Sequence, residues 1–308
     1  MPGRSTGLNN LISKNMETNY LTDIMLPLSL AIIMLGMGLS LVPYDFKRVA
    51  LYPRAASVGI LNQIIILPIV GFLLLWLFGL KSPELAVGIM ILAACPGGPT
   101  SNLISHISRG DTALSITLTA ISSMITVITI PLIINLALAF FMQQGEYIPL
   151  PVFDTIIKLI LITLLPVSIG MFIRAKAINF AEKMNKPVKI VSGILLFLII
   201  FAAIITNKEI FLSSFRDVGP IALSLNVVML FIGYISARLL RLRAAQSITI
   251  SVESGIQNGT LGITIASALL HNDVMAISPA IYSLIMFMTS GFIIAWANMG
   301  IRKVEIAD

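Results

Sequence analysis

Residues 251–262 read Ser251-Val252-Glu253-Ser254-Gly255-Ile256-Gln257-Asn258-Gly259-Thr260-Leu261-Gly262, and they interrupt an apolar run from about residue 246 to 270. Glu253 is the only acid placed midway along any apolar run of the chain. A charge at the centre of a bilayer costs about 2.5–3.5 kcal/mol on insertion scales. The glycines also weaken a helix, and unwound backbone survives at membrane depth only where protein or water satisfies it. The stretch therefore predicts a broken membrane helix at a cavity or cation site. The alternative is a kinked helix that holds a protonated, hydrogen-bonded glutamate.

A second stretch, Cys95-Pro96-Gly97-Gly98-Pro99-Thr100-Ser101-Asn102, interrupts another apolar run, from residue 85 to about 107. Its two prolines remove backbone donors, and its glycine pair permits turns that other residues resist. Two broken spans at corresponding places in the two halves of a chain indicate the binding site of a transporter. We expect them to cross near the bilayer midplane, with Gly97 and Gly255 unwound.

The composition indicates an integral membrane protein. Of the 308 residues 57% are hydrophobic and 11% are charged, and the mean hydropathy is +0.98. The net charge of +6 lies in short loops, so it indicates topology and not nucleic-acid binding. The single cysteine excludes an internal disulfide and a cysteine-based zinc site.

The apolar runs predict an all-α membrane protein with about nine spans, because each run can cross roughly 30 Å of hydrocarbon. No run shows the alternation of a membrane strand. Residues 1–23 are polar and lack the apolar core of a cleavable signal peptide. The expected spans are 25–43, 55–80, 85–107 (broken), 112–142, 155–174, 189–206, 218–240, 246–270 (broken) and 275–297.

The loop charges predict an N-terminus outside and a cytoplasmic C-terminus in the inner (plasma) membrane. With this orientation fourteen Lys and Arg residues lie inside and five outside, a clear positive-inside bias. The inside residues are Lys47, Arg48, Arg54, Arg109, Arg174, Lys176, Lys183, Lys186, Lys189, Arg238, Arg241, Arg243, Arg302 and Lys303.

An internal repeat pairs the two breaks. Leu61-Asn62-Gln63 resembles Leu225-Asn226-Val227, and Arg109-Gly110-Asp111 resembles His271-Asn272-Asp273. Because the halves enter the membrane with opposite sense, the repeat is inverted. We expect a polar N-terminal segment (1–24), a first repeat without a leading helix (25–142), a linker (143–154), a second repeat (155–297) and a tail (298–308).

Oxygen-bearing side chains at membrane depth predict two small-cation sites, since hard cations prefer carboxylate, carbonyl, amide and hydroxyl ligands. Each half-helix N-terminus favours an anion, and we expect Thr100, Ser101, Asn258 and Thr260 to begin the half-helices. The first cation set is Ser101, Asn102, Ser115, Thr119 and Glu253; the second is Gln63, Glu253, Gln257 and the carbonyls of Ser254 and Ile256; the substrate set is Thr100, Asn258, Gly98 and Thr260.

From about Leu26 to Trp296 the chain resembles the bile acid:sodium symporter family. The resemblance lies in Met34-Leu35-Gly36-Met37-Gly38-Leu39-Ser40-Leu41, Asp45-Phe46-Lys47-Arg48, Pro96-Gly97-Gly98, Ser101-Asn102, Arg109-Gly110-Asp111, Leu114-Ser115 and Glu253-Ser254-Gly255-Ile256-Gln257-Asn258. It implies a core domain with crossed broken helices, a panel domain that rocks against it, and two Na⁺ sites built from the two cation sets. Pro99 departs from the family, whose members often carry a hydroxyl there; the resemblance implies that Thr100 supplies the hydroxyl instead.

We expect sodium-coupled symport of an amphipathic monovalent organic anion, such as a bile-acid-like molecule, pantoate or a keto acid. Two Na⁺ ions and one carboxylate leave one positive charge for an anion to neutralise, and the apolar wall from Tyr282 to Met288 faces its carbon skeleton. The partners are the lipid bilayer and this small molecule, with no nucleic acid and no obligate protein partner.

Four other functions are weighed against this interpretation. Proton coupling would use Glu253 as the titrating group. Arsenite efflux would use Cys95, beside the first break. An enzyme is disfavoured because there is no His-Glu-x-x-His helix and His106 and His271 are the only histidines; we expect His106 to be a loop or packing residue. A passive channel would need a continuous polar pore.

Overall fold

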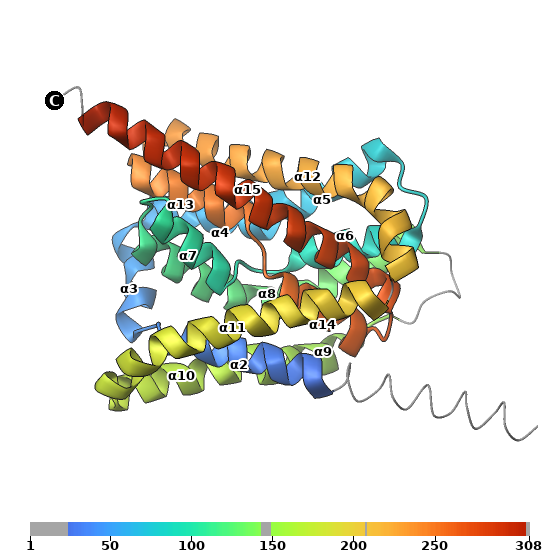
Figure 1. Ribbon diagram of the computed structural model, residues 1–308, viewed down its shortest axis with the longest axis horizontal. Coiled ribbons are helices and arrows are strands. Elements are labelled where there is room, and N and C mark those ends of the chain that lie inside the picture. Colours follow the sequence, from blue (N-terminus) through green and yellow to red (C-terminus); the bar gives the residue numbers. More distant parts are fainter. Residues whose placement is uncertain (1–23, 143–148, 207, 306–308) are drawn as a thin grey trace, which may run out of the picture.

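The computed structural model describes residues 24–142, 149–206 and 208–305, and these residues form a bundle of helices (Figure 1). Within them the only strand-type pairing is one isolated bridge, so the predicted all-α membrane protein is confirmed. Six continuous helical segments in this described part of the chain are long and apolar enough to cross a membrane. They are α4–η2–α5 (Pro53–Phe78), α8 (Thr112–Phe141), α9–η3–α10 (Val152–Lys176), α11 (Ile178–Thr206), α12 (Lys208–Leu239) and α15 (Asp273–Glu305).

The other three expected spans are shorter or broken. The first is α2 (Leu26–Gly38), which ends before the expected boundary and is followed by the separate helix α3 (Pro43–Leu51). The first broken span consists of α6 (Pro83–Ala94) and α7 (Pro99–Ile107). The second consists of α13 (Ala244–Gly255), α14 (Gly259–Thr264) and the π-turn η4 (Ile265–Leu269).

Several helices extend beyond the apolar runs. Helices α11 and α12 begin at Ile178 and Lys208, about ten residues before the expected starts, and α15 continues to Glu305 in what was expected to be a tail. Helix α9 begins at Val152, within the expected linker, of which residues 143–148 lie outside the described part of the chain. Hydropathy marks only the part of a helix that lies in hydrocarbon, whereas backbone hydrogen bonding continues into the interface.

Two of the long helices pass through a π-turn just before a Leu-Pro pair. These turns are η2 (Asn62–Ile66) before Pro68 and η3 (Ile160–Leu164) before Pro166. Proline has no N–H, so a carbonyl one turn earlier loses its helical partner. In η2 the register shifts and Leu67 N donates to Asn62 O. Such a turn re-aims side chains, and here Asn62 and Gln63 are both buried in the bundle.

The helices form two groups. Helix α2 packs against α10 and α11, and these form a layer along one side of the bundle (lower part of Figure 1). Gly38 and Gly170 permit the closest approach: a Cβ on Gly38 would lie 2.2 Å from Val167 O, and one on Gly170 would lie 2.4 Å from Leu35 O. The other group contains α5, α6, α8, α12, α13 and α15, packed around the two breaks.

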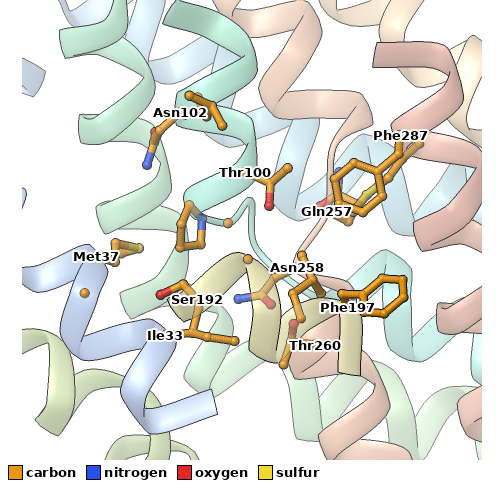
Figure 2. Close-up of a pocket in the computed structure, with 18 of the residues that line it drawn as sticks. Ile33, Met37, Thr100, Asn102, Ser192, Phe197, Gln257, Asn258, Thr260 and Phe287 are labelled. Atoms are coloured by element: carbon orange, nitrogen blue, oxygen red, sulfur yellow. The ribbon is translucent and has the colours of Figure 1, made fainter. Parts of the chain in front are cut away.

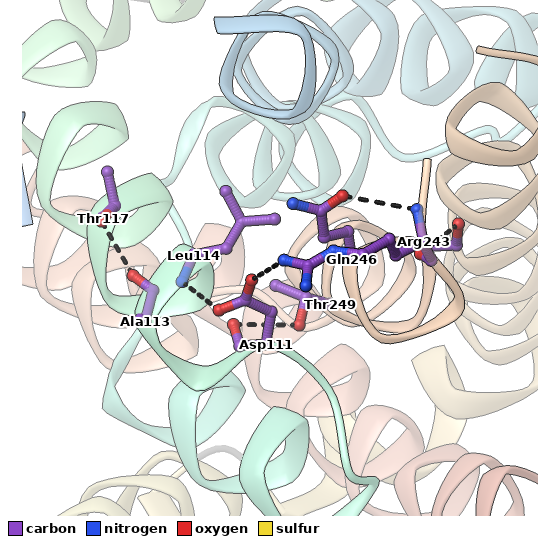
Figure 3. A network of polar contacts seen from close by, with 8 residues as sticks. Asp111, Ala113, Leu114, Thr117, Arg243, Gln246 and Thr249 are labelled. Carbon is purple, nitrogen blue, oxygen red and sulfur yellow. Dashed lines mark hydrogen bonds and ion pairs between the residues drawn. The ribbon is translucent and has the colours of Figure 1, made fainter. Parts of the chain in front are cut away.

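Polar contacts fix the turn between α7 and α8 to the start of α13 (Figure 3). The Asp111 carboxylate accepts a hydrogen bond from Leu114 N and lies 3.5 Å from Arg243 Nη2, while Thr249 Oγ1 donates to Asp111 O. The second break ends in a similar turn, where Asn272 accepts hydrogen bonds from Val274 N and Met275 N. The residues at the start of both turns are left-handed, with φ of 55° at Arg109 and 50° at His271. Both related tripeptides therefore begin with a left-handed residue and cap the helix that follows, Asp111 from the third position and Asn272 from the second.

Candidate functional site

The two breaks meet backbone to backbone in the interior of the bundle. Gly97 and Gln257 form an antiparallel bridge, and Asn258 N donates to Pro96 O at 2.9 Å. Gly97 is outside any helix, as expected, and a Cβ there would lie 2.5 Å from Glu253 Oε2. Unwound backbone groups of the two breaks therefore form hydrogen bonds with each other at the crossing. The crossing also leaves no room for a side chain at Gly97.

The ends of the half-helices differ in part from the prediction. Gly255 is not unwound; it is the last residue of α13, and the break covers residues 256–258. Asn258 caps α14 as expected, because its Oδ1 accepts from Leu261 N. On the other side α7 begins at Pro99 with Gly98 as the N-cap, so Thr100 and Ser101 lie in the first turn and do not begin the helix. Proline suits this position because its missing N–H would be unpaired there.

A cluster of four oxygen-bearing residues surrounds the Glu253 carboxylate, and Glu253 is 3% exposed. Ser101 Oγ lies 2.7 Å from Glu253 Oε1, and Ser115 Oγ contacts the same oxygen. Thr119 Oγ1 lies 2.9 Å from Oε2. Asn102 Oδ1 completes the group, at 2.9 Å from Ser115 Oγ and 3.2 Å from Thr119 Oγ1. All five residues of the first predicted cation set therefore lie together.

This cluster contains fewer protons than its contacts require. Ser101, Ser115 and Thr119 each approach two acceptor oxygens, which gives six oxygen–oxygen contacts of 3.2 Å or less when Gly98 O is included. Each hydroxyl carries one proton, so with the Asn102 amide oxygen turned toward Ser115 and Thr119 at most three of these contacts are hydrogen bonds at one time. The other three bring lone pairs together around a carboxylate. A cation or an added proton would relieve this repulsion.

A second group of polar atoms lies where the two breaks cross, around the side chains of Gln63 and Gln257. Gln63 Nε2 donates to Gln257 Oε1 at 2.6 Å and to Cys95 O at 2.8 Å. Gln257 Nε2 donates to Ser254 O at 2.8 Å. Ile256 is the first residue of the break and is extended, so its carbonyl lies outside the helical pattern. Three members of the second predicted cation set, Gln63, Gln257 and the Ser254 carbonyl, thus contact one another at the crossing, and the side-chain oxygen of Gln63 is buried and unpartnered. The hydrogen bonds of the Glu253 carboxylate all go to the first set.

A cavity of about 660 Å³ opens beside the crossing, and all four predicted substrate residues line it. Figure 2 shows Thr100, Asn258 and Thr260 at the crossing, with Phe197 and Phe287 on one side of the view and Ile33, Met37 and Ser192 on the other. Because Asn258 Oδ1 is used in the helix cap, its Nδ2 group remains as a donor to the cavity. The N-terminal ends of α7 and α14 therefore face the same space.

The walls of the cavity are mostly apolar and come from α2, α11 and α15. Helix α11 contributes a continuous face from Val188 to Ile204, which includes the stacked pair Phe197 and Phe201. Within this face Gly193 is open, since no heavy atom lies within 4 Å of the position that a Cβ would take. His106 is the only ionisable side chain among the described residues that line the cavity.

The predicted wall from Tyr282 to Met288 is only partly correct. Leu284, Met286 and Phe287 line the cavity. Tyr282 instead is fully buried beside the end of α13, where its hydroxyl donates to Gly255 O. Met288 is 71% exposed and points away from the cavity lining. The prediction treated the segment as one surface, whereas neighbouring residues of a helix point about 100° apart.

His106 was expected to be a loop or packing residue, and this expectation was wrong. It lies in the last turn of α7, lines the cavity, and has Nδ1 3.3 Å from Thr112 Oγ1. The signal was its spacing of four from Asn102, which places both side chains on one helix face. Cys95 does not line the cavity: it is fully buried and its Sγ donates to Ile91 O.

Comparisons with known proteins complete the description. A family model described as "Sodium Bile acid symporter family" matches residues 27–214. The "Uncharacterized sodium-dependent transporter YocS" of Bacillus subtilis is 29% identical over 277 residues, which cover 90% of this chain and 84% of that protein. The "Ileal sodium/bile acid cotransporter" of Homo sapiens is 28% identical over 311 residues, covering 98% and 86%. The protein named "Probable sodium/metabolite cotransporter BASS1, chloroplastic" of Arabidopsis thaliana is 31% identical over 268 residues, covering 86% and 64%.

Proposed function

The chain belongs to the Sodium Bile acid symporter family, and from that premise we propose that it couples two Na⁺ ions to the uptake of one amphipathic organic anion by alternating access. Sodium-dependent transport across a membrane is the function of the family, and the chain is a multi-pass membrane transporter and not an enzyme. The number of ions, the residues that hold them and the class of the anion are our proposals.

The observation that carries the proposal is the proton-poor oxygen cluster around Glu253. Sodium is a hard cation that binds carboxylate, hydroxyl and amide oxygens, and Ser101, Ser115, Thr119 and the Asn102 amide supply them. A buried carboxylate without a cation would be expensive to keep charged at membrane depth. We therefore place the first Na⁺ among these residues.

The second Na⁺ would lie between Gln63, Gln257 and the end of α13. At present the amide N–H groups of both glutamines point to carbonyl and amide oxygens that a cation would use. Rotation of each amide by half a turn would bring its oxygen to the position that its N–H group now occupies. The Gln63 Oε1 atom, which is buried without a hydrogen-bond partner, would then gain the cation as a partner. Ser254 O, Ile256 O and Glu253 would complete the site.

The charge of the substrate follows from the charges at the crossing. Two Na⁺ ions and the Glu253 carboxylate leave one net positive charge in a poorly hydrated interior, where an unpaired charge is costly. An anion held beside Gly98, Thr100, Asn258 and Thr260 would neutralise it, and the amides at the starts of α7 and α14 would receive its oxygens. We propose a monovalent anion for this reason.

The carbon skeleton of the substrate would face the apolar walls. Phe197, Phe201, Phe287 and the aliphatic residues of α11 favour an amphipathic acid over a small polar one. Bile-acid-like molecules, pantoate and keto acids fit this description. The human relative is named a bile acid cotransporter, whereas the plant relative is named a metabolite cotransporter, so we propose the chemical class and not one compound.

We place the N-terminus outside and the C-terminus in the cytoplasm, and we propose that this conformation is open inward. The cavity reaches His106 and Thr112, next to the basic turn that contains Arg109. The α10–α11 turn and the end of α15, which also carry predicted inside charges, lie at one end of the bundle (left in Figure 1). On the opposite side of the crossing α2 and η3 pack closely against α8 and α14, leaving a void of about 10 Å³.

The proposal is tested by uptake into proteoliposomes that contain the purified protein. A panel of labelled bile acids, pantoate and keto acids would be offered with an inward gradient of sodium, of potassium or of protons. We expect concentrative uptake of at least one amphipathic anion with sodium alone. Uptake driven by a proton gradient without sodium would favour the rival in which Glu253 is protonated. Arsenite efflux has no support at the site, because Cys95 is outside the cavity.

A further inference from the structure

The carbonyl oxygen of Gly255, the last residue of α13, receives two side-chain hydrogen bonds. Asn226 Nδ2, from α12, donates to it at 2.8 Å, and the Tyr282 hydroxyl, from α15, donates at 2.7 Å. The two donors also contact each other, with Asn226 Nδ2 3.3 Å from Tyr282 Oη. Both side chains are completely buried. Helices from two different parts of the core therefore converge on a single carbonyl.

This arrangement is unusual for the interior of a membrane protein. Buried polar side chains at membrane depth are costly unless they are paired, and most hydroxyls in such helices bond their own backbone. Ser254, Ser283 and Ser290 do so in this structure. Tyr282 and Asn226 instead donate to a carbonyl of another helix. In this position the Asn226 Oδ1 atom is buried and has no hydrogen-bond partner. Their two hydrogen bonds to the Gly255 carbonyl, at the end of α13, therefore explain why these polar side chains lie here.

The end of α13 supplies the carbonyls of the proposed second Na⁺ site. Val252 O is bonded to Ile256 N, and Ser254 O faces the Gln257 amide. Successive carbonyls of a helix point about 100° apart around its axis. With Gly255 O held toward α12 and α15, the peptide on each side of it cannot rotate freely. Ser254 O is thereby kept toward Gln257, which contacts Gln63. Ile256 is the next residue along the chain, so the direction of its carbonyl depends on the same peptide.

We propose that Asn226 and Tyr282 are positioning residues for the second Na⁺ site: they hold the Gly255 carbonyl so that the Ser254 and Ile256 carbonyls on either side of it point to the ion. This inference rests on the proposed function, because it requires the second site to exist. Asn226 and Tyr282 would touch neither the ion nor the substrate, and they line no part of the cavity.

The main test is Tyr282→Phe, which removes one donor and keeps the ring. Loss of one hydrogen bond of about 0.5–1.5 kcal/mol should raise the sodium concentration for half-maximal uptake roughly two- to tenfold. The half-saturating anion concentration at saturating sodium should stay within about twofold. Ser290→Ala is the matched control: it removes a buried hydroxyl from the same helix that bonds only its own backbone, and sodium dependence should not change.

Asn226→Ala provides a second variant, and it should change sodium dependence in the same direction. Sodium-induced stabilisation of the purified protein against heat gives a readout that does not need transport. If both variants lower uptake with an unchanged half-saturating sodium concentration and an unchanged sodium-induced stabilisation, the pair is only structural and the inference is wrong.

Gln63→Ala separates this inference from the proposal beneath it. If Gln63→Ala raises the sodium requirement and Tyr282→Phe does not, the second site exists but the positioning role fails. If Gln63→Ala also leaves sodium dependence unchanged, the second site itself fails. In the double variant we expect little effect of Tyr282→Phe beyond that of Gln63→Ala, since both changes act on one ion.

Discussion

Ser101 on α7 and Glu253 on α13 are 152 residues apart in the chain, and a hydrogen bond of 2.7 Å joins Ser101 Oγ to Glu253 Oε1. Ser101 lies in the first turn of one half-helix and Glu253 in the last turn of the other. The contact therefore links the anion-favouring end of α7 to the only carboxylate at the crossing. An ion bound at Glu253, as we propose, would act on the helix end that faces the cavity, and this contact would then couple the ion to the substrate.

Glu253→Gln should abolish sodium-driven uptake. The change keeps the size of the side chain and removes its charge, and a charge pair at about 4 Å contributes roughly 4 kcal/mol in a partly buried setting. Sodium binding should weaken by at least about a hundredfold. Ser115→Ala, which removes one neutral oxygen, should weaken it only a few-fold. The measurement is the sodium dependence of uptake in proteoliposomes. Full sodium-driven uptake by Glu253→Gln would show the ion assignment to be wrong.

Gln63→Ala should reduce the number of bound sodium ions from two to one. Gln63 belongs only to the second site, and the cluster of Ser101, Ser115 and Thr119 around Glu253 does not contact it. Equilibrium binding of radioactive sodium to the purified protein measures the number directly. Asn62→Ala is the control: Asn62 is the preceding residue in the same π-turn and is buried, but it bonds Ser236 away from the crossing. Two ions bound in both variants would contradict the second site.

Substrate and sodium should each raise the affinity for the other by the same factor. The reason is the single net positive charge that two sodium ions leave beside Glu253, and linkage requires the effect to be reciprocal. Calorimetric titration of a transported acid with and without sodium, and of sodium with and without the acid, provides both factors. The amide of the same acid serves as the uncharged control. Equal binding of acid and amide would rule out the charge argument.

Gly193→Leu should select against bulky substrates. A leucine would occupy cavity space that is open beside α11, and overpacking of about 1–3 kcal/mol should weaken binding of a bile-acid-sized anion roughly five- to hundredfold. Small keto acids should be affected much less. Gly291→Leu is the matched control, because Gly291 is also an open glycine within a helix but lies outside the cavity lining. The same loss in both variants would assign the effect to the helix and not to the cavity.

Single-cysteine variants should confirm the orientation. The one native cysteine, Cys95, is fully buried, so the unmodified protein should not react with an impermeant maleimide. In a Cys95→Ala background, Lys81→Cys should be labelled from outside intact cells, whereas Lys176→Cys should be labelled only after the cells are opened. Both lysines are exposed. The reverse pattern would place the N-terminus inside.

Much of the architecture could be predicted from local properties of the sequence. Apolar runs identify spans because hydrocarbon requires them, and Pro, Gly and a mid-span carboxylate identify breaks because each is costly in a continuous membrane helix. These properties determined the all-α class, the two crossovers and the central place of Glu253. They also brought Ser101, Ser115 and Thr119 into one expected set, because cation binding explains why so many side-chain oxygens lie near a break at membrane depth.

The direction of individual side chains was decided only by the tertiary structure. In a membrane span the lipid-facing and the core-facing sides are both apolar, so the sequence does not show which side a neighbouring helix covers. Tyr282 was therefore assigned to the cavity wall although it holds the Gly255 carbonyl, and His106 was set aside although it lines the cavity. The sequence marked Asn226 only as the counterpart of Asn62 in the internal repeat. Its role depends on a contact between α12 and the end of α13 that no local pattern records, because long-range packing alone brings those two surfaces together.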